Sequence, residues 1–297
     1  MKHISVLLSE SIDSLEIVAG DIVLDGTLGG GGHTKEIIRR FGSTVKVIGI
    51  DLDSDALVRA EEEIKDMDHD TVFKVGAFQD SDIILDELNI AKVDKVLLDL
   101  GLSSFQIDIS GRGFSFLRDE PLLMTLKKDP KEDDITAIQI VNNWKEETLA
   151  DIIYGFGEEK YARRIAKAIV EQRLLKKIET TKDLRDIIQN AVGGFYKKSK
   201  IHASTRTFQA IRIAVNTELP AIEIALEKLW DRLSPGGRIA VIAFHSLEDR
   251  IVKNFFRKMA NEEKGILINK KPIIPKDDEI ISNPRSRSSK LRTIEKI

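Results

Sequence analysis

The stretch Asp25-Gly26-Thr27-Leu28-Gly29-Gly30-Gly31-Gly32-His33 places four consecutive glycines directly after an apolar run that ends at Leu24. Glycine loses more backbone entropy on folding than any other residue. Its repetition therefore indicates positive φ angles, or a ligand that lies closer to the main chain than a Cβ would allow. We interpret the stretch as a ligand-binding loop.

The residues on either side of this loop predict a strand and a helix. Residues 21–24 are typical of a buried parallel strand, and residues 34–41 carry a helical pattern. A strand, a glycine turn and a helix place backbone N–H groups and the positive end of a helix dipole at the carboxyl edge of a sheet. Taken alone, such a loop fits a nucleotide-type site and a tight structural turn equally well.

A second predicted strand, over residues 45–50, ends on Asp51. Asp51 follows the glycines by about 20 residues, the spacing at which an acidic residue accepts hydrogen bonds from ribose hydroxyls. The glycines do not follow the G-x-G-x-x-G order of dinucleotide sites, and His33 stands where the helix begins. The pattern favours adenosine attached to something other than a pyrophosphate, and S-adenosylmethionine is the natural candidate.

Composition narrows the class of protein. The chain has 297 residues, of which 42% are hydrophobic and 32% charged, as in globular proteins. It contains no cysteine and its five histidines lack ligand-like spacing, so we expect neither disulfides nor a metal. No apolar run reaches the roughly 18 residues of a membrane span, and we found no signal-peptide profile. We therefore expect a cytoplasmic protein without a membrane partner.

The net charge of −3 argues against a nucleic-acid partner, but net charge averages over all faces of a protein. The basic residues from Arg285 to Arg292 form a cluster that a solvated helix face does not easily explain.

The chain up to about residue 105 alternates strand and helix patterns, which predicts a parallel sheet with right-handed crossovers. Phe78 follows the third strand and either covers an adenine or belongs to the core. The fourth strand ends on Asp99, followed by a loop that contains Ser103. The strands are expected near 22–25, 45–50, 71–75 and 95–99.

From about residue 107 to 200 the pattern is helical only, which predicts an inserted all-helical domain. The entry to this domain, residues 111–116, mixes glycines and Arg112 with aromatic residues, as in segments that stack on bases and contact phosphates. The strand and helix pattern resumes after residue 204. A strand over 238–244 there delivers His245 to the sheet edge, with Ser246 as expected N-cap of the next helix and Asp249 at its N3 position. Residues 266–297 predict a hairpin that closes the sheet.

Six segments of this sequence closely resemble the motifs of the bacterial ribosomal RNA small subunit methyltransferase H family, in the family's order over nearly the whole chain. They are residues 25–33, 99–104, 112–116, 205–216, 245–250 and 283–288.

The resemblance implies an α/β fold with a Rossmann-like class I methyltransferase sheet and an all-helical insertion domain. It divides the chain into 1–106 and 204–297 for the methyltransferase domain and 107–203 for the insertion. It implies N4-methylation of a cytidine in the decoding region of 16S rRNA, within the small ribosomal subunit, with S-adenosylmethionine as cofactor. By position, the family's cofactor-binding residues correspond to Gly31, Gly32, His33, Asp51, Phe78, Asp99 and Gln106.

The cytosine N4 lone pair is delocalised into the ring, so a hydrogen-bond acceptor on the amino group would favour attack. Our candidates for this catalytic role are the loop after Asp99, with Ser103, together with Asn216 and His245. The expected RNA contacts are Arg112, Phe114, Arg206, Arg285 and Arg287.

The chain departs from the family pattern on the acceptor side. Phe105 stands where the family has proline, and residues 202–206 read H-A-S-T-R in place of H-P-A-T-R. Leu123 and Thr125 stand where the family's P-L-D-M-R-M has an acid and a base. Two alternatives therefore stay open, a cofactor-binding ribosome-assembly factor without turnover and a DNA amino-methyltransferase. The latter normally carries an aromatic residue after the fourth-strand motif, which Ser103-Ser104 does not match.

Overall fold

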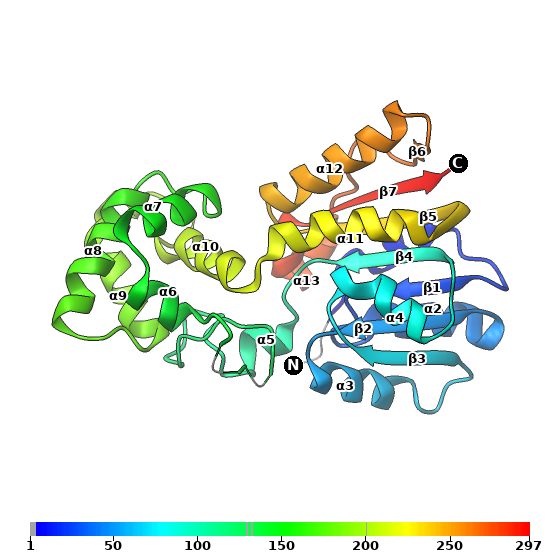
Figure 1. Ribbon diagram of the computed structural model, residues 1–297, viewed down its shortest axis with the longest axis horizontal. Coiled ribbons are helices and arrows are strands. Elements are labelled where there is room, and N and C mark those ends of the chain that lie inside the picture. Colours follow the sequence, from blue (N-terminus) through cyan, green and yellow to red (C-terminus); the bar gives the residue numbers. More distant parts are fainter. Residues whose placement is uncertain (1–3, 129, 132, 200) are drawn as a thin grey trace. The chain divides into compact units, whose positions relative to one another are not determined.

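The computed structural model describes residues 4–128, 130–131, 133–199 and 201–297. The chain divides into two compact units, which Figure 1 shows in sequence colours. The first unit consists of Met1–Ser103 and Leu219–Ile297, and the second of Ser104–Glu218. The helical unit is thus inserted into the connection that follows the fourth strand.

The first unit is built on one sheet of seven strands in the order β3-β2-β1-β4-β5-β7-β6. The pairs from β3 to β5 are parallel, and β7 runs antiparallel to both β5 and β6, which closes the sheet with the expected hairpin. Strand order reverses at β1, with β2 on one side and β4 on the other. The strands are β1 (Ile22–Asp25), β2 (Lys46–Asp51), β3 (Asp70–Val75), β4 (Val93–Asp99), β5 (Leu233–Ala243), β6 (Gly265–Leu267) and β7 (Lys290–Lys296).

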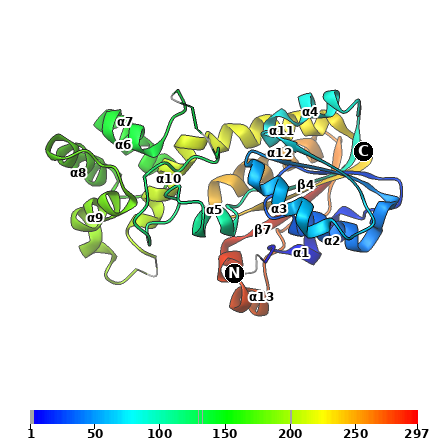
Figure 2. The same ribbon diagram turned by 90° about the horizontal axis from the view of Figure 1, so that it is seen from below.

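Helices cover both faces of the sheet (Figures 1 and 2). Successive strand residues point to opposite faces, so Val23 and Leu24 belong to two different hydrophobic cores. The helices of this unit are α1 (Leu8–Leu15), α2 (Gly32–Phe41), α3 (Ser54–Ile64), α4 (Ser81–Glu87), α11 (Glu218–Arg232), α12 (Ser246–Asn261) and α13 (Asp277–Ser282), with short 3-10 helices η1 (Gly42–Thr44), η2 (Phe78–Asp80) and η4 (Pro284–Ser288).

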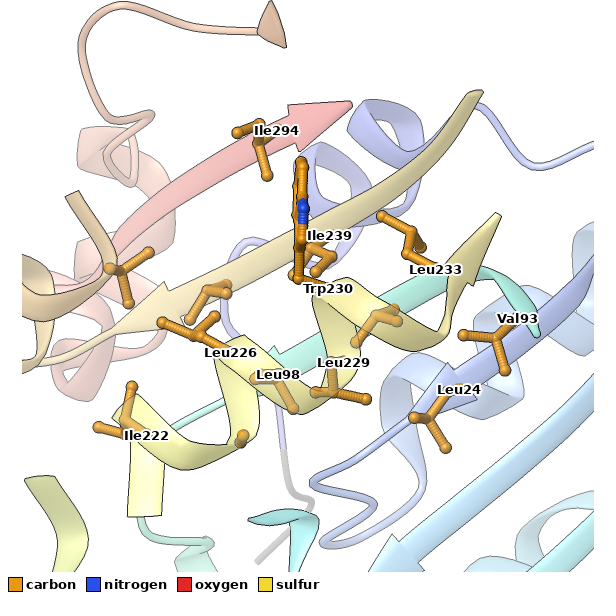
Figure 3. Close-up of a cluster of buried hydrophobic side chains, with 14 of the residues drawn as sticks. Leu24, Val93, Leu98, Ile222, Leu226, Leu229, Trp230, Leu233, Ile239 and Ile294 are labelled. Atoms are coloured by element: carbon orange, nitrogen blue, oxygen red, sulfur yellow. The ribbon is translucent and has the colours of Figure 1, made fainter. Parts of the chain in front are cut away.

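The larger core lies between the sheet and α11. Leu226, Leu229 and Trp230 of α11 share this core with Leu24 and Leu98 of the central strands. Figure 3 shows the Trp230 ring beside Ile239 and Ile294. Each such aliphatic or aromatic side chain contributes about 1.5–3 kcal/mol when fully buried. The central strands are therefore the rigid part of the unit, and the residues at their carboxyl ends are held by it.

The second unit is helical and has a core of its own. Helix α10 buries Phe208 and Ile211 in this core, so the unit extends to Glu218, whereas the sequence places the end of the insertion at residue 203. Its helices are α5 (Ser104–Asp108), α6 (Ala137–Asn143), α7 (Glu146–Gly155), α8 (Ala162–Leu175), α9 (Thr181–Val192) and α10 (Ser204–Asn216), with the 3-10 helix η3 (Gly193–Tyr196).

The helix caps test the sequence predictions in detail. Asp53 caps α3, and Thr180 caps α9 in a capping box with Asp183. The cap predicted at Ser246 is wrong by one residue. His245 occupies the N-cap position of α12, and its imidazole replaces a hydroxyl as the acceptor. Among the helices of the described ranges, none combines the length and the apolarity that crossing a membrane requires.

Candidate functional site at the carboxyl edge of the sheet

Three aspartates end neighbouring strands where the strand order reverses. Asp25 ends β1, Asp51 ends β2 and Asp99 ends β4. In open parallel sheets ligands bind outside the carboxyl ends of the strands at such a reversal. This edge is the candidate site.

The glycine loop after β1 is tied to both neighbouring strands. The Gly26 N–H donates to the Leu97 carbonyl at 3.0 Å, and the Leu28 N–H to the Ile50 carbonyl at 2.9 Å. Gly31 has a φ of 72° and caps α2. A Cβ on it would lie 2.8 Å from the Ala60 Cβ of α3. Backbone conformation and close packing on α3 thus already require glycine at position 31.

Asp51 holds this loop through backbone hydrogen bonds. Its Oδ2 accepts from the Gly29 N–H at 2.8 Å and its Oδ1 from the Asp53 N–H at 2.9 Å. Burial raises the pKa of the Asp51 carboxyl. Each carboxylate oxygen has a second lone pair, so Asp51 can accept ligand hydroxyls while it fixes the loop.

Asp25 is buried beneath the loop, with 1% of its surface exposed. Its carboxylate accepts from the Thr34 hydroxyl at 2.8 Å and from the Thr27 N–H at 3.2 Å. Burial raises the pKa of Asp25 to about 6, although these two hydrogen bonds lower it. Asp25 therefore positions the loop and the first turn of α2, a role that the sequence analysis did not assign.

Asp99 is the one of these three aspartates with an unsatisfied acceptor. Its backbone N–H donates to the Thr27 hydroxyl at 2.6 Å, which fixes the strand end to the glycine loop. Its Oδ1 is buried and has no hydrogen-bond partner among the described residues. Burial, followed by the charge of Asp25, raises the pKa of Asp99 to about 7. An orphaned buried acceptor of this kind calls for a ligand that donates hydrogen bonds or carries positive charge.

His33 lies in the first turn of α2 and faces Asp99. Its Nδ1 is 4.0 Å from Asp99 Oδ2, and its Nε2 is 3.2 Å from the Val6 carbonyl oxygen. Only 6% of His33 is exposed. The contact with Val6 fixes the orientation of the ring, so the structure brings His33 and Asp99 together as the sequence predicts of a shared site.

The loop after β4 also packs closely on the rest of the edge. A Cβ on Gly101 would lie 2.6 Å from the Phe244 ring, at the end of β5. Ser103 follows in the same loop, and a Cβ on Gly29 would lie 3.9 Å from the Ser103 Cβ. Phe78 packs partly buried against the larger core, with its Cβ near Gly26.

His245 closes the edge on the β5 side, where it caps α12. Its Nδ1 accepts from the Glu248 N–H at 3.4 Å. Its Nε2 lies 3.0 Å from Glu248 Oε1 but makes no hydrogen bond within the described part of the chain. Glu248 is 1% exposed and its Oε2 accepts from the Phe244 and His245 N–H groups. The imidazole is thus held firmly, with one ring nitrogen left for a ligand.

The other predicted site residues lie in the second unit or on the basic segment. Asn216 anchors the chain of its own unit, because its Oδ1 accepts from the Leu126 N–H at 2.9 Å and its Nδ2 donates to the Met124 and Arg212 carbonyls. Gln106 is buried in α5. Neither residue belongs to the unit that contains Asp99.

The predicted RNA contacts differ in exposure. Arg112 is 6% exposed, donates to the Leu126 carbonyl at 2.7 Å and lies over the Phe114 ring at 5.7 Å. Arg206 donates to the Glu158 carbonyl at 2.9 Å. Arg285 and Arg287, in η4 of the first unit, are exposed.

The residues of the first unit fit S-adenosylmethionine. The orphaned Asp99 Oδ1 offers an acceptor to a cationic ligand, and Asp51 offers free lone pairs at the end of β2. Asp25, Thr27 and Glu248 also belong to this edge, although the sequence pattern did not predict a role for them. Asp25 and Thr27 stand inside the quoted glycine stretch, so the signal was present, but hydrogen bonds between strand ends cannot be read from spacing.

Comparisons with known proteins show which family the chain resembles over its length. A family model described as the MraW methylase family matches residues 1–297. The chain is 44% identical over 311 residues to "Ribosomal RNA small subunit methyltransferase H" of Clostridium botulinum (strain 657 / Type Ba4), covering 100% of this chain and 99% of that protein. It is 42% identical to the protein of the same name from Lachnospira eligens, with coverages of 100% and 98%. It is 44% identical to that of Kosmotoga olearia, with coverages of 99% and 97%.

Proposed function

The chain belongs to the MraW methylase family, and from this premise we propose that it transfers a methyl group from S-adenosylmethionine to N4 of a cytidine in the decoding region of 16S rRNA. The observation that carries the proposal is the match over the full length to proteins named ribosomal RNA small subunit methyltransferase H. The orphaned acceptor of Asp99 at the strand-order reversal supports the same reaction.

S-adenosylmethionine supplies a methyl group on a positively charged sulfur, so the donor carries the driving force of the reaction. The protein's contribution is alignment, which accounts for much of the rate gain in reactions of this kind. The glycine loop, Asp51 and His33 would hold the cofactor, and Phe78 would lie against its adenine. Gly32 begins α2, so the positive end of that helix adds to the site.

The acceptor amine needs its lone pair turned toward the methyl group. An acceptor that takes a hydrogen bond from the amino group favours this pyramidal form, and we assign the role to Asp99 Oδ1, with Ser103 as a further contact. His245 Nδ1 accepts from the Glu248 N–H, so its Nε2 carries the ring proton and would donate to the target base. The N4 lone pair forms the new bond as the carbon–sulfur bond breaks, and N4 then loses one proton. Asp99 would be ionised beside the cationic cofactor and is therefore placed to accept that proton.

The remaining predicted residues receive supporting roles. Asn216 and Arg112 stabilise the 121–126 segment of the second unit, and Gln106 follows the Asp99 loop in sequence. Arg206, Arg285 and Arg287 would contact phosphates, with Phe114 stacking on a base. The substrate is the 16S rRNA within the small ribosomal subunit, which places the reaction in the bacterial cytoplasm.

One assay tests the proposal against its alternatives. Purified protein is given methyl-labelled S-adenosylmethionine together with naked 16S rRNA, small ribosomal subunits or DNA. We expect label in the rRNA at N4 of one cytidine. Label in DNA would favour the DNA amino-methyltransferase. Tight binding of the cofactor without any label would favour the assembly factor.

A further inference from the structure

The first unit contains a pocket of about 300 Å³ beside the turn from β5 to α12. One wall is formed by the residues that precede β7, including η4, and another by the first residues of α12. The volume is at the lower end of the range of about 300–1,000 Å³ for sites that hold small molecules. It is sufficient for one nucleotide-sized group.

One side of the pocket is apolar and borders the proposed catalytic loop. Phe244, Ile274 and Pro275 line this side. The Phe244 ring also lies against Gly101, where a Cβ would be 2.6 Å from it. The pocket and the loop after Asp99 therefore share a wall, so a group bound in the pocket would lie next to the site of methyl transfer.

The other side carries excess positive charge. Arg287 and Lys290 both line the pocket. Arg287 makes no hydrogen bond or ion pair with any residue that the structure describes. Lys290 Nζ lies 3.1 Å from Asp249 Oδ2, but Arg292 Nε lies 2.6 Å from Oδ1 of the same carboxylate. One aspartate thus faces two cations, and even with the buried Glu248 counted the local balance is positive.

A buried hydroxyl gives an independent indication of a ligand. Ser289 lines the pocket and is 1% exposed, yet its Oγ has no hydrogen-bond partner in the described part of the chain. A buried hydroxyl without a partner is unfavourable, and an incoming acceptor would satisfy it. Ser246, the first residue of the 16-residue helix α12, also lines the pocket, so the positive end of that helix dipole borders it.

We propose that this pocket binds one nucleotide of the RNA substrate, adjacent to and distinct from the cytidine that is methylated, with His245 of the pocket lining between the two. Its phosphate would contact Arg287, Lys290 and the Ser289 hydroxyl, and its base would lie against Phe244 and Pro275. The proposal rests on the RNA methyltransferase function. It adds a specific site at which a neighbouring nucleotide holds the target strand in place.

Three variants of the full chain test the pocket. Arg287→Ala removes the unpaired cation, and Ser289→Ala removes the unpaired hydroxyl. The matched control is Arg257→Ala, which removes an exposed arginine further along α12 and away from the pocket. For each protein we would measure binding of a 16S rRNA fragment that contains the target, at several salt concentrations. Cofactor affinity and melting temperature would be measured in parallel.

We expect Arg287→Ala to weaken RNA binding by about tenfold and to lower the salt slope by about one. Ser289→Ala should weaken RNA binding by several-fold while the melting temperature stays equal or rises, because the free protein loses only an unsatisfied group. A structural hydroxyl would instead lower the melting temperature. Cofactor affinity should remain unchanged in all variants, and the control should bind RNA like the unmodified protein.

Several outcomes would overturn the proposal. One is unchanged RNA affinity in both pocket variants. Another is tight binding of cytidine monophosphate that Arg287→Ala abolishes while RNA binding persists, which would mark a site for free nucleotides. A different outcome would overturn the proposed function alone: the unmodified protein binds RNA, the pocket variants weaken that binding, and yet no methyl group is transferred. A protein that binds no RNA at all would overturn both.

Discussion

Asp51 has two roles in one carboxylate, and they are separable by experiment. Both oxygens hold backbone N–H groups, of Gly29 and of Asp53, and the remaining lone pairs are assigned to the cofactor ribose. We predict that Asp51→Ala weakens S-adenosylmethionine binding by roughly tenfold to a hundredfold, from the loss of charge-assisted hydrogen bonds. Because the loop also loses its anchor, the melting temperature should fall as well.

Calorimetric titration and thermal unfolding measure the two effects of Asp51→Ala. Asp70→Ala is the matched control, because Asp70 pairs with Lys46 at the amino ends of β3 and β2, where both side chains are partly exposed. Surface pairs of this kind are worth at most about 1 kcal/mol. Unchanged cofactor affinity in Asp51→Ala would remove Asp51 from the binding site.

The raised pKa of Asp99 makes the stability of the free protein dependent on pH. Its folded pKa of about 7 lies above the usual aspartate value of 3.8, so the free folded protein retains the proton as pH rises. The free protein should therefore lose stability as pH rises from about 4 through 7, because the unfolded chain releases that proton earlier. Asp25, with a pKa raised to about 6, acts in the same direction.

A cationic ligand prefers ionised Asp99, so S-adenosylmethionine should bind more tightly as pH rises from 6 to 8. Calorimetry over this range checks the expectation. Asp99→Asn should flatten the dependence, and S-adenosylhomocysteine, which lacks the sulfonium charge, should show a weaker one. Equal pH dependence for both ligands would show that Asp99 does not face the sulfonium.

At the scale of the element, helix α12 depends on an imidazole where a hydroxyl or carboxylate is usual. His245 accepts from the Glu248 N–H, while Glu248 accepts from the His245 N–H, so the two residues form a reciprocal box. Asparagine is also a good N-cap. We predict that His245→Asn keeps the melting temperature within a few degrees but lowers kcat, because it removes the Nε2–H donor assigned to the target base.

Single-turnover methyl transfer on the rRNA gives the catalytic readout for His245→Asn. His245→Ala is the comparison, and it should lower stability by about 1 kcal/mol from the lost cap. Full activity in both variants would restrict His245 to its role in the helix.

Leu123 and Thr125 stand in a segment that the second unit holds by its backbone. Met124 between them has a φ of 55°, and the Asn216 and Arg112 side chains bind the carbonyls of Met124 and Leu126. Thr125 is 4% exposed. Thr125→Arg alone should therefore destabilise the protein by about 3 kcal/mol or more, since it buries an unpaired charge.

If the acid and the base of the family pattern form a structural ion pair, Leu123→Asp should recover part of that loss in the double variant. Denaturant unfolding of the four proteins of this cycle gives the coupling free energy. The unmodified chain should itself transfer the methyl group to the rRNA. A chain that binds cofactor but gains activity only in the double variant would show that the missing charges are catalytic.

These elements also show what the sequence could predict. The strands that end at Asp51 and Asp99 could be predicted from the sequence, because a parallel strand that is buried on both faces is a continuous run of apolar residues. Helix α1 escaped prediction because it starts after Leu7 in a left-handed conformation, without a capping side chain. The sequence prediction ended the insertion at residue 203 and not at Glu218. The apolar face of α10 has the same pattern whether the helix packs on the core of the first unit or of the second. The unsatisfied Asp99 oxygen could not be predicted, because it depends on how the strand ends pack in three dimensions.

At the scale of the whole molecule, the chain places its helical unit in the connection between β4 and α11. The chain leaves the sheet directly after the loop that follows Asp99 and returns at Leu219. An insertion at this connection leaves the strand order undisturbed, because β5, β7 and β6 follow it in sequence and complete the sheet. The catalytic edge and the insertion are therefore linked in sequence through residues 100–104.

The net charge of −3 leads to a prediction about the form of the substrate. Like charge opposes association with RNA, and extracting the target base from its stack costs a few kcal/mol more. The repulsion and the cost of extracting the base must be outweighed by contacts that depend on shape and by positive charge in segments such as Arg285 to Arg292. A folded ribonucleoprotein presents such contacts in fixed positions, whereas free RNA must be ordered first.

We therefore predict that small ribosomal subunits are methylated at least about tenfold more efficiently, in kcat/KM, than naked 16S rRNA, a difference of roughly 1.4 kcal/mol. Binding should weaken with salt for both, because phosphate contacts release counterions. Subunits in which the target cytidine is replaced by uridine, which has no amino group, are the control for site specificity. Equal efficiency on a short naked RNA and on subunits would contradict the prediction, because local sequence alone would then suffice for recognition.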